Sequence, residues 1–258
     1  MHSESTASNR GAGRWRAVAA ASLQWHAGVD GCRGGWVVAL AGLQAGRPAQ
    51  LNLHRCETFS AVLALCPESV QVAVDMPIGL LERASPGGRE CDRAARALLG
   101  HPFSSSVFSP PARPALANEG YGDAMRRNGA GMSKQAYNIL PRIREVDEVM
   151  TPALQARVFE THPELVFARL AGQPMRHSKR TMTGRGERMR VLRAVWGSLM
   201  PDPGRVRTLL GRGQVAHDDV LDACVLAYAA VCIAAGKASR VPEVPPRDAR
   251  GLRMEIWY

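Results

Sequence analysis

Several acidic residues of this sequence stand where carboxylates can do chemistry. Asp30 follows the apolar run 27–29 and precedes a glycine-rich stretch, residues 31–35, a pattern that predicts a strand, a hairpin turn and a second strand. Asp75 stands near the end of another apolar, β-branched run, residues 70–76. Because burying an unpaired carboxylate costs several kcal/mol, each acid either caps a turn or a helix or forms part of a metal site.

The two runs that carry Asp30 and Asp75 are expected to be parallel neighbours in one sheet. A helical pattern over residues 58–65 comes directly before the second run, and a crossover helix leads to a parallel strand. Parallel strands bring their carboxyl ends to one edge, where ligands of open α/β sheets bind. Two carboxylates there repel each other unless a cation or a shared proton compensates, which favours a metal site. Considered alone, Asp75 is better explained as an N-cap for residues 77–80.

Two further acidic groups follow later in the chain. Asp219 and Asp222 are three residues apart at the start of an apolar, Ala-rich helical pattern, residues 216–231, so they share one face of a helix that we expect to be buried. Capping needs only one acid there, and carboxylates fit Mg²⁺ or Mn²⁺. Glu164, close to Glu160 and His162, adds a candidate catalytic acid at a strand-to-helix junction. Its alternative explanation is a favourable charge at a helix N-terminus.

Basic and hydroxyl side chains in two long segments are typical of phosphate binding. Residues 101–114 are too rich in Pro and Ser for regular structure, and residues 178–186 form a Gly- and Arg-rich stretch that matches neither the P-loop nor the dinucleotide pattern. A solvated helix face with a loose loop explains the first segment equally well. The residues expected to contact substrate phosphates are Arg33, Ser106, Arg113, Lys134, Lys179 and Arg180.

Composition constrains the class of protein. A formal net charge of +10 suits a polyanionic partner, yet only three of the 33 basic residues are Lys, and GC-rich coding explains an excess of Arg as readily. Six cysteines without a C-x-x-C pair indicate reduced thiols and a cytoplasmic protein. No apolar run reaches the roughly 18 residues needed to span a bilayer, so no membrane partner is expected. Nothing in the sequence indicates the oligomeric state.

The elements that position these residues are expected to form one domain over residues 25–258, with a helical and loop insertion at about 84–156. Residues 1–24 are interpreted as a disordered leader or the product of an upstream start codon. The remaining patterns predict strands over residues 36–41, 51–55 and 157–161, helices over 89–99, 133–150, 186–197 and 203–211, and an edge strand over 252–258.

This order of elements resembles the ribonuclease H-like fold, an α/β fold with a mixed five-stranded sheet of three antiparallel and then parallel strands, covered by helices on both faces. The acid positions resemble its RuvC-like branch. The chain is also similar to the DUF429 family, predicted RNase H-like nucleases, from about residue 26 onward. The phrases that carry this resemblance are GVDGCRGGW (28–36), DMPIGL (75–80), RECD (89–92), SVF (106–108), EVD (145–147), HPE (162–164), SKRT (178–181) and LDA (221–223).

The resemblance implies metal-dependent hydrolysis of nucleic-acid phosphodiester bonds by a two-metal mechanism. Asp30 would bridge two Mg²⁺ or Mn²⁺ ions, with Asp75 on one side and Asp219 or Asp222 on the other, and Glu160 or Glu164 would complete the shell or orient a water. Two alternatives stay open. One is an ATP-dependent phosphotransferase of the actin-like fold, which thermal stabilisation by ATP would reveal. The other is a non-catalytic nucleic-acid or partner-binding module, whose binding would survive chelation.

Overall fold

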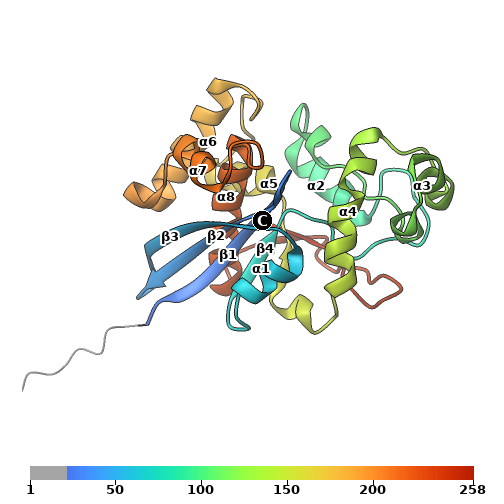
Figure 1. Ribbon diagram of the computed structural model, residues 1–258, viewed down its shortest axis with the longest axis horizontal. Coiled ribbons are helices and arrows are strands. Elements are labelled where there is room, and N and C mark those ends of the chain that lie inside the picture. Colours follow the sequence, from blue (N-terminus) through green and yellow to red (C-terminus); the bar gives the residue numbers. More distant parts are fainter. Residues whose placement is uncertain (1–21) are drawn as a thin grey trace, which may run out of the picture.

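A five-stranded mixed sheet forms the centre of the protein (Figure 1). The computed structural model describes residues 22–258, so most of the expected leader lies outside the described residues, and Gln24 already belongs to the first strand. The strand order is β3-β2-β1-β4-β5, with β3, β2 and β1 antiparallel and β1, β4 and β5 parallel. The strands are β1 (Gln24–Cys32), β2 (Gly35–Gln44), β3 (Arg47–Cys56), β4 (Gln71–Val74) and β5 (Val158–Glu160). The predicted α/β fold, with a mixed five-stranded sheet of three antiparallel and then parallel strands, is therefore confirmed.

Eight α-helices surround the sheet within the described part of the chain. They are α1 (Phe59–Leu65), α2 (Glu90–Leu99), α3 (Tyr121–Asn128), α4 (Lys134–Val149), α5 (Pro163–Ala171), α6 (Met182–Trp196), α7 (Pro203–Leu210) and α8 (His217–Ala234). Figure 1 shows α6, α7 and α8 gathered on one side of the sheet and α2, α3 and α4 grouped away from them. Helices α2, α3 and α4 lie between β4 and β5 in the chain, within the range expected for the insertion.

The apolar residues of β1 alternate between the two faces of the sheet, as the period of two of a strand requires. Ala27 and Val29 belong to a core with α1 and α4, together with Val72 and Val74 of β4. The opposite face packs against α8, whose core includes Ala73 of β4. Residues in phase with Ala73 therefore face α8.

Gly28 lets α8 lie directly against the sheet. A Cβ atom at this position would stand 2.0 Å from the backbone nitrogen of Ala227 and 2.2 Å from the carbonyl oxygen of Ala223, closer than real Cβ contacts. Only glycine permits this approach of helix to strand. The start of α8 is thereby brought next to the end of β1.

Three expectations about local structure are corrected. The first strand does not end on Asp30 but runs to Cys32, and the hairpin turn lies at Arg33 and Gly34. The Gly- and Arg-rich segment is only partly a loop, because α6 begins at Met182 with Thr181 as its N-cap. The expected edge strand over 252–258 is reduced to β7 (Ile256–Trp257), which pairs with β6 (Arg240–Val241) and touches the main sheet through the bridge between Trp257 and Thr161.

None of the helices within residues 22–258 combines the length and the apolar character that crossing a membrane requires.

Candidate functional site

Asp30 and Asp75 lie side by side on the α8 face of the sheet. Val29 pairs with Val74, and the backbone N–H of Asp75 donates to the carbonyl of Val29 at 3.0 Å, so the ladder continues one residue beyond β4. Both acids are in phase with the residues that face α8. No helix forms at residues 77–80, so the interpretation of Asp75 as an N-cap is wrong. The predicted meeting of two carboxylates at one sheet edge is what the strands produce.

The first two turns of α8 add two acids with different roles, Asp219 and Asp222. Asp222 is 1% exposed. Asp219 lies one turn earlier, and its Oδ2 accepts a hydrogen bond from the backbone nitrogen of Ala216 at 2.7 Å. Asp219 therefore caps the helix, as a carboxylate at the third helical position does. Asp222 is free of that task and lies behind the sheet acids.

The electrostatics link these acids. Burial raises the pKa of Asp30 well above its usual value, and the charges of Asp222 and Asp75 raise it further. Burial, with a contribution from Asp222, raises the pKa of Asp75 to about 7. Burial also raises the pKa of Asp219 to about 6. Their mutual repulsion makes a compensating positive charge favourable at this point of the fold.

Lys179 supplies one such charge. Its Nζ lies 2.5 Å from Oδ2 of Asp222, and its positive charge also acts on Asp30 and Asp75. The other oxygen of Asp222, Oδ1, is buried and has no hydrogen-bond partner within residues 22–258. A buried carboxylate oxygen without a partner is unfavourable, and here it marks a place where a cation would be stabilised.

A pocket of about 790 Å³ opens in front of these residues. Asp30 and Asp75 line it from the sheet, Ser106 lines it from a short 3-10 helix after α2, Phe103–Ser106, and Lys179 and Arg180 line it from the segment before α6. Acids at the base and basic or hydroxyl groups on the walls are suited to an anion held through a cation.

A family model described as a protein of unknown function (DUF429) matches residues 28–247, most of the chain. The chain belongs to the DUF429 family. The matched range contains every acid and every basic residue expected at the site. Neither the comparison with curated proteins nor that with solved structures gave a match.

The donor chemistry of the DUF429 chain fits a hard divalent cation, although no ready-made ligand set is present. Within residues 22–258, no group of three or more His, Cys, Asp and Glu side chains is placed to hold a metal ion. Two predicted ligands are already engaged, Asp219 with the helix N-terminus and Asp222 with Lys179. The carboxylates of Asp30 and Asp75 and the unpartnered Oδ1 of Asp222 are oxygen ligands of the kind that Mg²⁺ and Mn²⁺ take.

Glu164 lines the pocket, but its carboxylate is bound. The guanidinium of Arg188, which is fully buried, donates to Oε1 and Oε2 of Glu164 from Nη2 at 2.7 Å each. Such a two-pronged contact holds a carboxylate in one orientation. Glu164 thus anchors α6 to α5 at the pocket. The sequence predicted a catalytic acid at this position and did not predict this structural contact.

Glu160 points away from the acid pair. It pairs with Val74 across β5 and β4, so it shares the face of the sheet opposite to Asp75. There Oε1 accepts from Nη2 of Arg89 at 2.5 Å, and Oε2 accepts from the backbone nitrogen of Ile78 at 2.7 Å. Glu160 therefore does not complete the shell around Asp30 and Asp75.

Three of the six residues expected to contact phosphate line the pocket, namely Ser106, Lys179 and Arg180. Arg33 is exposed at the turn between β1 and β2, and Lys134 is exposed in the first turn of α4, next to the pocket-lining Ser133. Neither of them belongs to the lining of the pocket.

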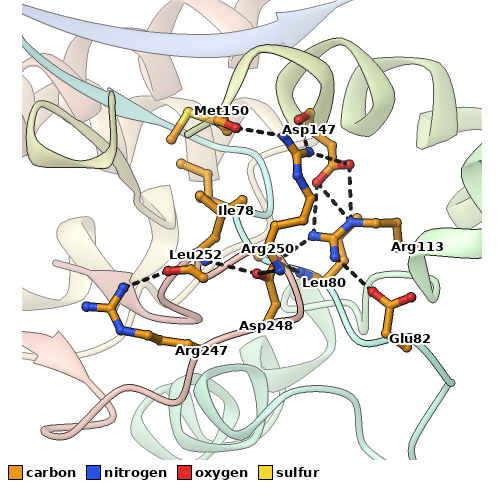
Figure 2. A network of polar contacts seen from close by, with 12 residues as sticks. Ile78, Leu80, Glu82, Arg113, Asp147, Met150, Arg247, Asp248, Arg250 and Leu252 are labelled. Carbon is orange, nitrogen blue, oxygen red and sulfur yellow. Dashed lines mark hydrogen bonds and ion pairs between the residues drawn. The ribbon is translucent and has the colours of Figure 1, made fainter. Parts of the chain in front are cut away.

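Arg113 lies instead in a network of ion pairs (Figure 2). Its guanidinium pairs with Asp248 and with Asp147 at 3.2 Å, and it reaches Glu82 at 2.8 Å. Arg250 pairs with the same Asp147, at 3.1 Å. This network ties the C-terminal segment to α4 and to the chain after β4, and it leaves Arg113 no part in the pocket lining.

The sequence interpretation missed the two buried arginines that hold the acids beside the site. Arg188 and Arg89 bind Glu164 and Glu160 across 24 and 71 residues of sequence. No short-range pattern joins such partners. The one available signal was the need of any buried acid for a partner, which the sequence does not place in space.

Proposed function

We propose that this DUF429 protein is a divalent-metal-dependent nuclease that hydrolyses phosphodiester bonds of nucleic acid. The observation that carries the proposal is the meeting of Asp30 and Asp75 in a pocket that Lys179 and Arg180 also line, with Asp222 of α8 close enough for its charge to act on both acids. Their mutual repulsion favours a bound cation, and the basic net charge of +10 favours a polyanionic substrate.

In this proposal the acids of the site bind the metal ion and its basic residues bind the substrate. Asp30 and Asp75, which line the pocket, would hold the ion together with the buried Oδ1 of Asp222. Lys179 and Arg180 would bind the substrate's phosphates and keep the backbone oriented over the acids. A divalent ion bound there would polarise the phosphate and lower the pKa of a water that attacks it.

The test is cleavage of single- and double-stranded DNA and RNA by the purified full chain, with Mg²⁺ or Mn²⁺ and with a chelator. We expect cleavage that needs the ion and that falls by at least about 100-fold in Asp30→Asn and Asp75→Asn, as the loss of a group that stabilises the transition state does. Asp218→Asn is the matched control. Asp218 is an acid in the first turn of α8, the helix that carries Asp222, and it lies outside the pocket lining. Full activity of either site variant would refute the proposal.

A chain that binds nucleic acid equally well in chelator, and that shows no cleavage with any divalent ion, would also refute hydrolysis. The result would then support the non-catalytic binding module.

A further inference from the structure

Lys179 stands between the pocket and Asp222. The pocket is lined by Asp30, Asp75 and Lys179, whereas Asp222, 1% exposed, is not part of the lining. The ammonium group lies 2.5 Å from Oδ2 of Asp222. An ion that enters the pocket can therefore contact Asp30 and Asp75 directly, whereas Asp222 is already paired with Lys179.

The backbone that carries Lys179 is fixed by the first turns of α6. The carboxylate of Glu187 accepts from the backbone nitrogens of Arg176 at 2.8 Å and His177 at 3.1 Å. A Cβ atom on Gly184 would stand 2.0 Å from the carbonyl oxygen of Ser178, so only glycine lets this segment pack so closely on the helix. Residues 176–178, directly before Lys179, are thus held against α6.

Two arginines complete this anchoring. Nη1 of the buried Arg188 donates to the carbonyl of His177 at 2.9 Å, while its other nitrogens hold Glu164. Nε of Arg185 donates to the carbonyl of Lys179 itself at 3.3 Å. The position of Lys179 over Asp222 is therefore part of the folded framework.

We propose that Lys179 acts as a permanent cation of the carboxylate cluster, so that the site takes one divalent ion in place of two. This inference rests on the proposed function, and it replaces the two-ion expectation drawn from the family resemblance. Once a bound ion has displaced their protons, Asp30, Asp75 and Asp222 carry three negative charges, and one lysine with one divalent ion neutralises them. A second divalent ion would leave a buried site with excess positive charge, which a low-dielectric environment disfavours.

Displacing the lysine is also unfavourable on the side of Asp222. Its Oδ1 already lacks a partner within the described residues, and loss of Lys179 would leave both oxygens of a buried carboxylate unpaired. Although the Lys179 side chain is 35% exposed, Asp222 is buried, and a buried carboxylate left without its partner is destabilising. Lys179 therefore stays in place when the ion binds at the sheet acids.

The experiment is titration of the full, metal-free chain with Mn²⁺ alone, followed by calorimetry and by the electron paramagnetic resonance signal of free Mn²⁺. We expect one ion per chain in the parent and two in Lys179→Met, which keeps the unbranched shape of the side chain up to Cε and removes the charged group. Arg180→Met is the matched control, because Arg180 is the neighbouring pocket-lining cation, and it should bind one ion as the parent does.

Two ions bound by the parent would overturn the inference, and this result does not depend on whether Lys179→Met folds. A folded Lys179→Met that still binds one ion would overturn it as well. Binding of one ion without cleavage of nucleic acid would refute the proposed function and leave the inference standing, whereas two ions with cleavage would do the reverse.

Discussion

The close contact between β1 and α8 at Gly28 is the packing feature on which the carboxylate cluster depends, and it can be tested with Gly28→Ala. The added Cβ would meet three backbone atoms of α8 at 2.0, 2.2 and 2.5 Å. Backbone atoms cannot rotate away as a side chain does, so the helix itself must shift. Overpacking in a core lowers the free energy of unfolding by about 1–3 kcal/mol and occasionally more, and we expect a loss of about 3 kcal/mol for Gly28→Ala.

For a chain of 258 residues, that loss corresponds to a fall in Tm of roughly 6–12 °C, at about 2–4 °C per kcal/mol. The control is Gly31→Ala on the same strand, where the nearest atom to the new Cβ is Cε of Met76 at 3.6 Å, an ordinary contact. We expect Gly31→Ala to leave the free energy of unfolding within about 1 kcal/mol of the parent.

Thermal unfolding by calorimetry and urea unfolding by circular dichroism measure both variants. Gly28→Ala should also weaken Mn²⁺ binding, because a displaced α8 carries Asp222 away from Asp30, while Gly31→Ala should not change that affinity. Equal stability of the two variants would refute the reasoning, since it would mean that α8 does not pack on β1 at the distance described.

The buried ion pairs and the acid cluster lead to three further predictions. Glu164→Gln leaves the buried Arg188 uncompensated and should cost about 3–5 kcal/mol in urea unfolding, which a purely catalytic role of Glu164 would not. Arg113→Met should lower stability by about 2 kcal/mol without changing the affinity for nucleic acid in a filter-binding assay. Burial raises the pKa of Asp75 to about 7, so the folded state binds the proton of this carboxyl more tightly than the unfolded state. In chelator, the free energy of unfolding should therefore fall as pH rises from about 4 to 7. Asp75→Asn should flatten that slope, and urea midpoints measured across this pH range test the prediction.

The sheet and its acid pair could be predicted because each depends on a local pattern. The alternation around Asp30 and the apolar run ending near Asp75 predict strands, and the intervening crossover predicts their parallel direction. The start of α8 could be predicted equally well, since Asp219 and Asp222 stand at the beginning of a long apolar helix. What the pattern left open was which of these two acids caps the helix, and that depended on where the backbone nitrogen of Ala216 points.

The partners of the other acids could not be predicted, because they depend on register and on contacts distant in sequence. A shift of one residue along β5 would have turned Glu160 toward Asp75. The observed register turns it toward Arg89, 71 residues away. In a chain with 33 basic residues, no sequence signal says which arginine pairs with a buried acid and which one meets substrate.

The choice of lysine at position 179 fits this division of roles. The buried Arg188 uses the planar fork of its guanidinium to hold the carboxylate of Glu164, and the buried Arg89 holds Asp92 and Glu160 with two hydrogen bonds or more to each. The ammonium of Lys179 is a compact charge that acts on Asp222, Asp30 and Asp75 together. A point charge shared among three carboxylates suits lysine, whereas a forked donor fixes the orientation of each carboxylate that it binds. In a chain with only three lysines, the presence of one at this position is therefore itself an indication that position 179 serves the acid cluster as a cation and not as a structural clamp.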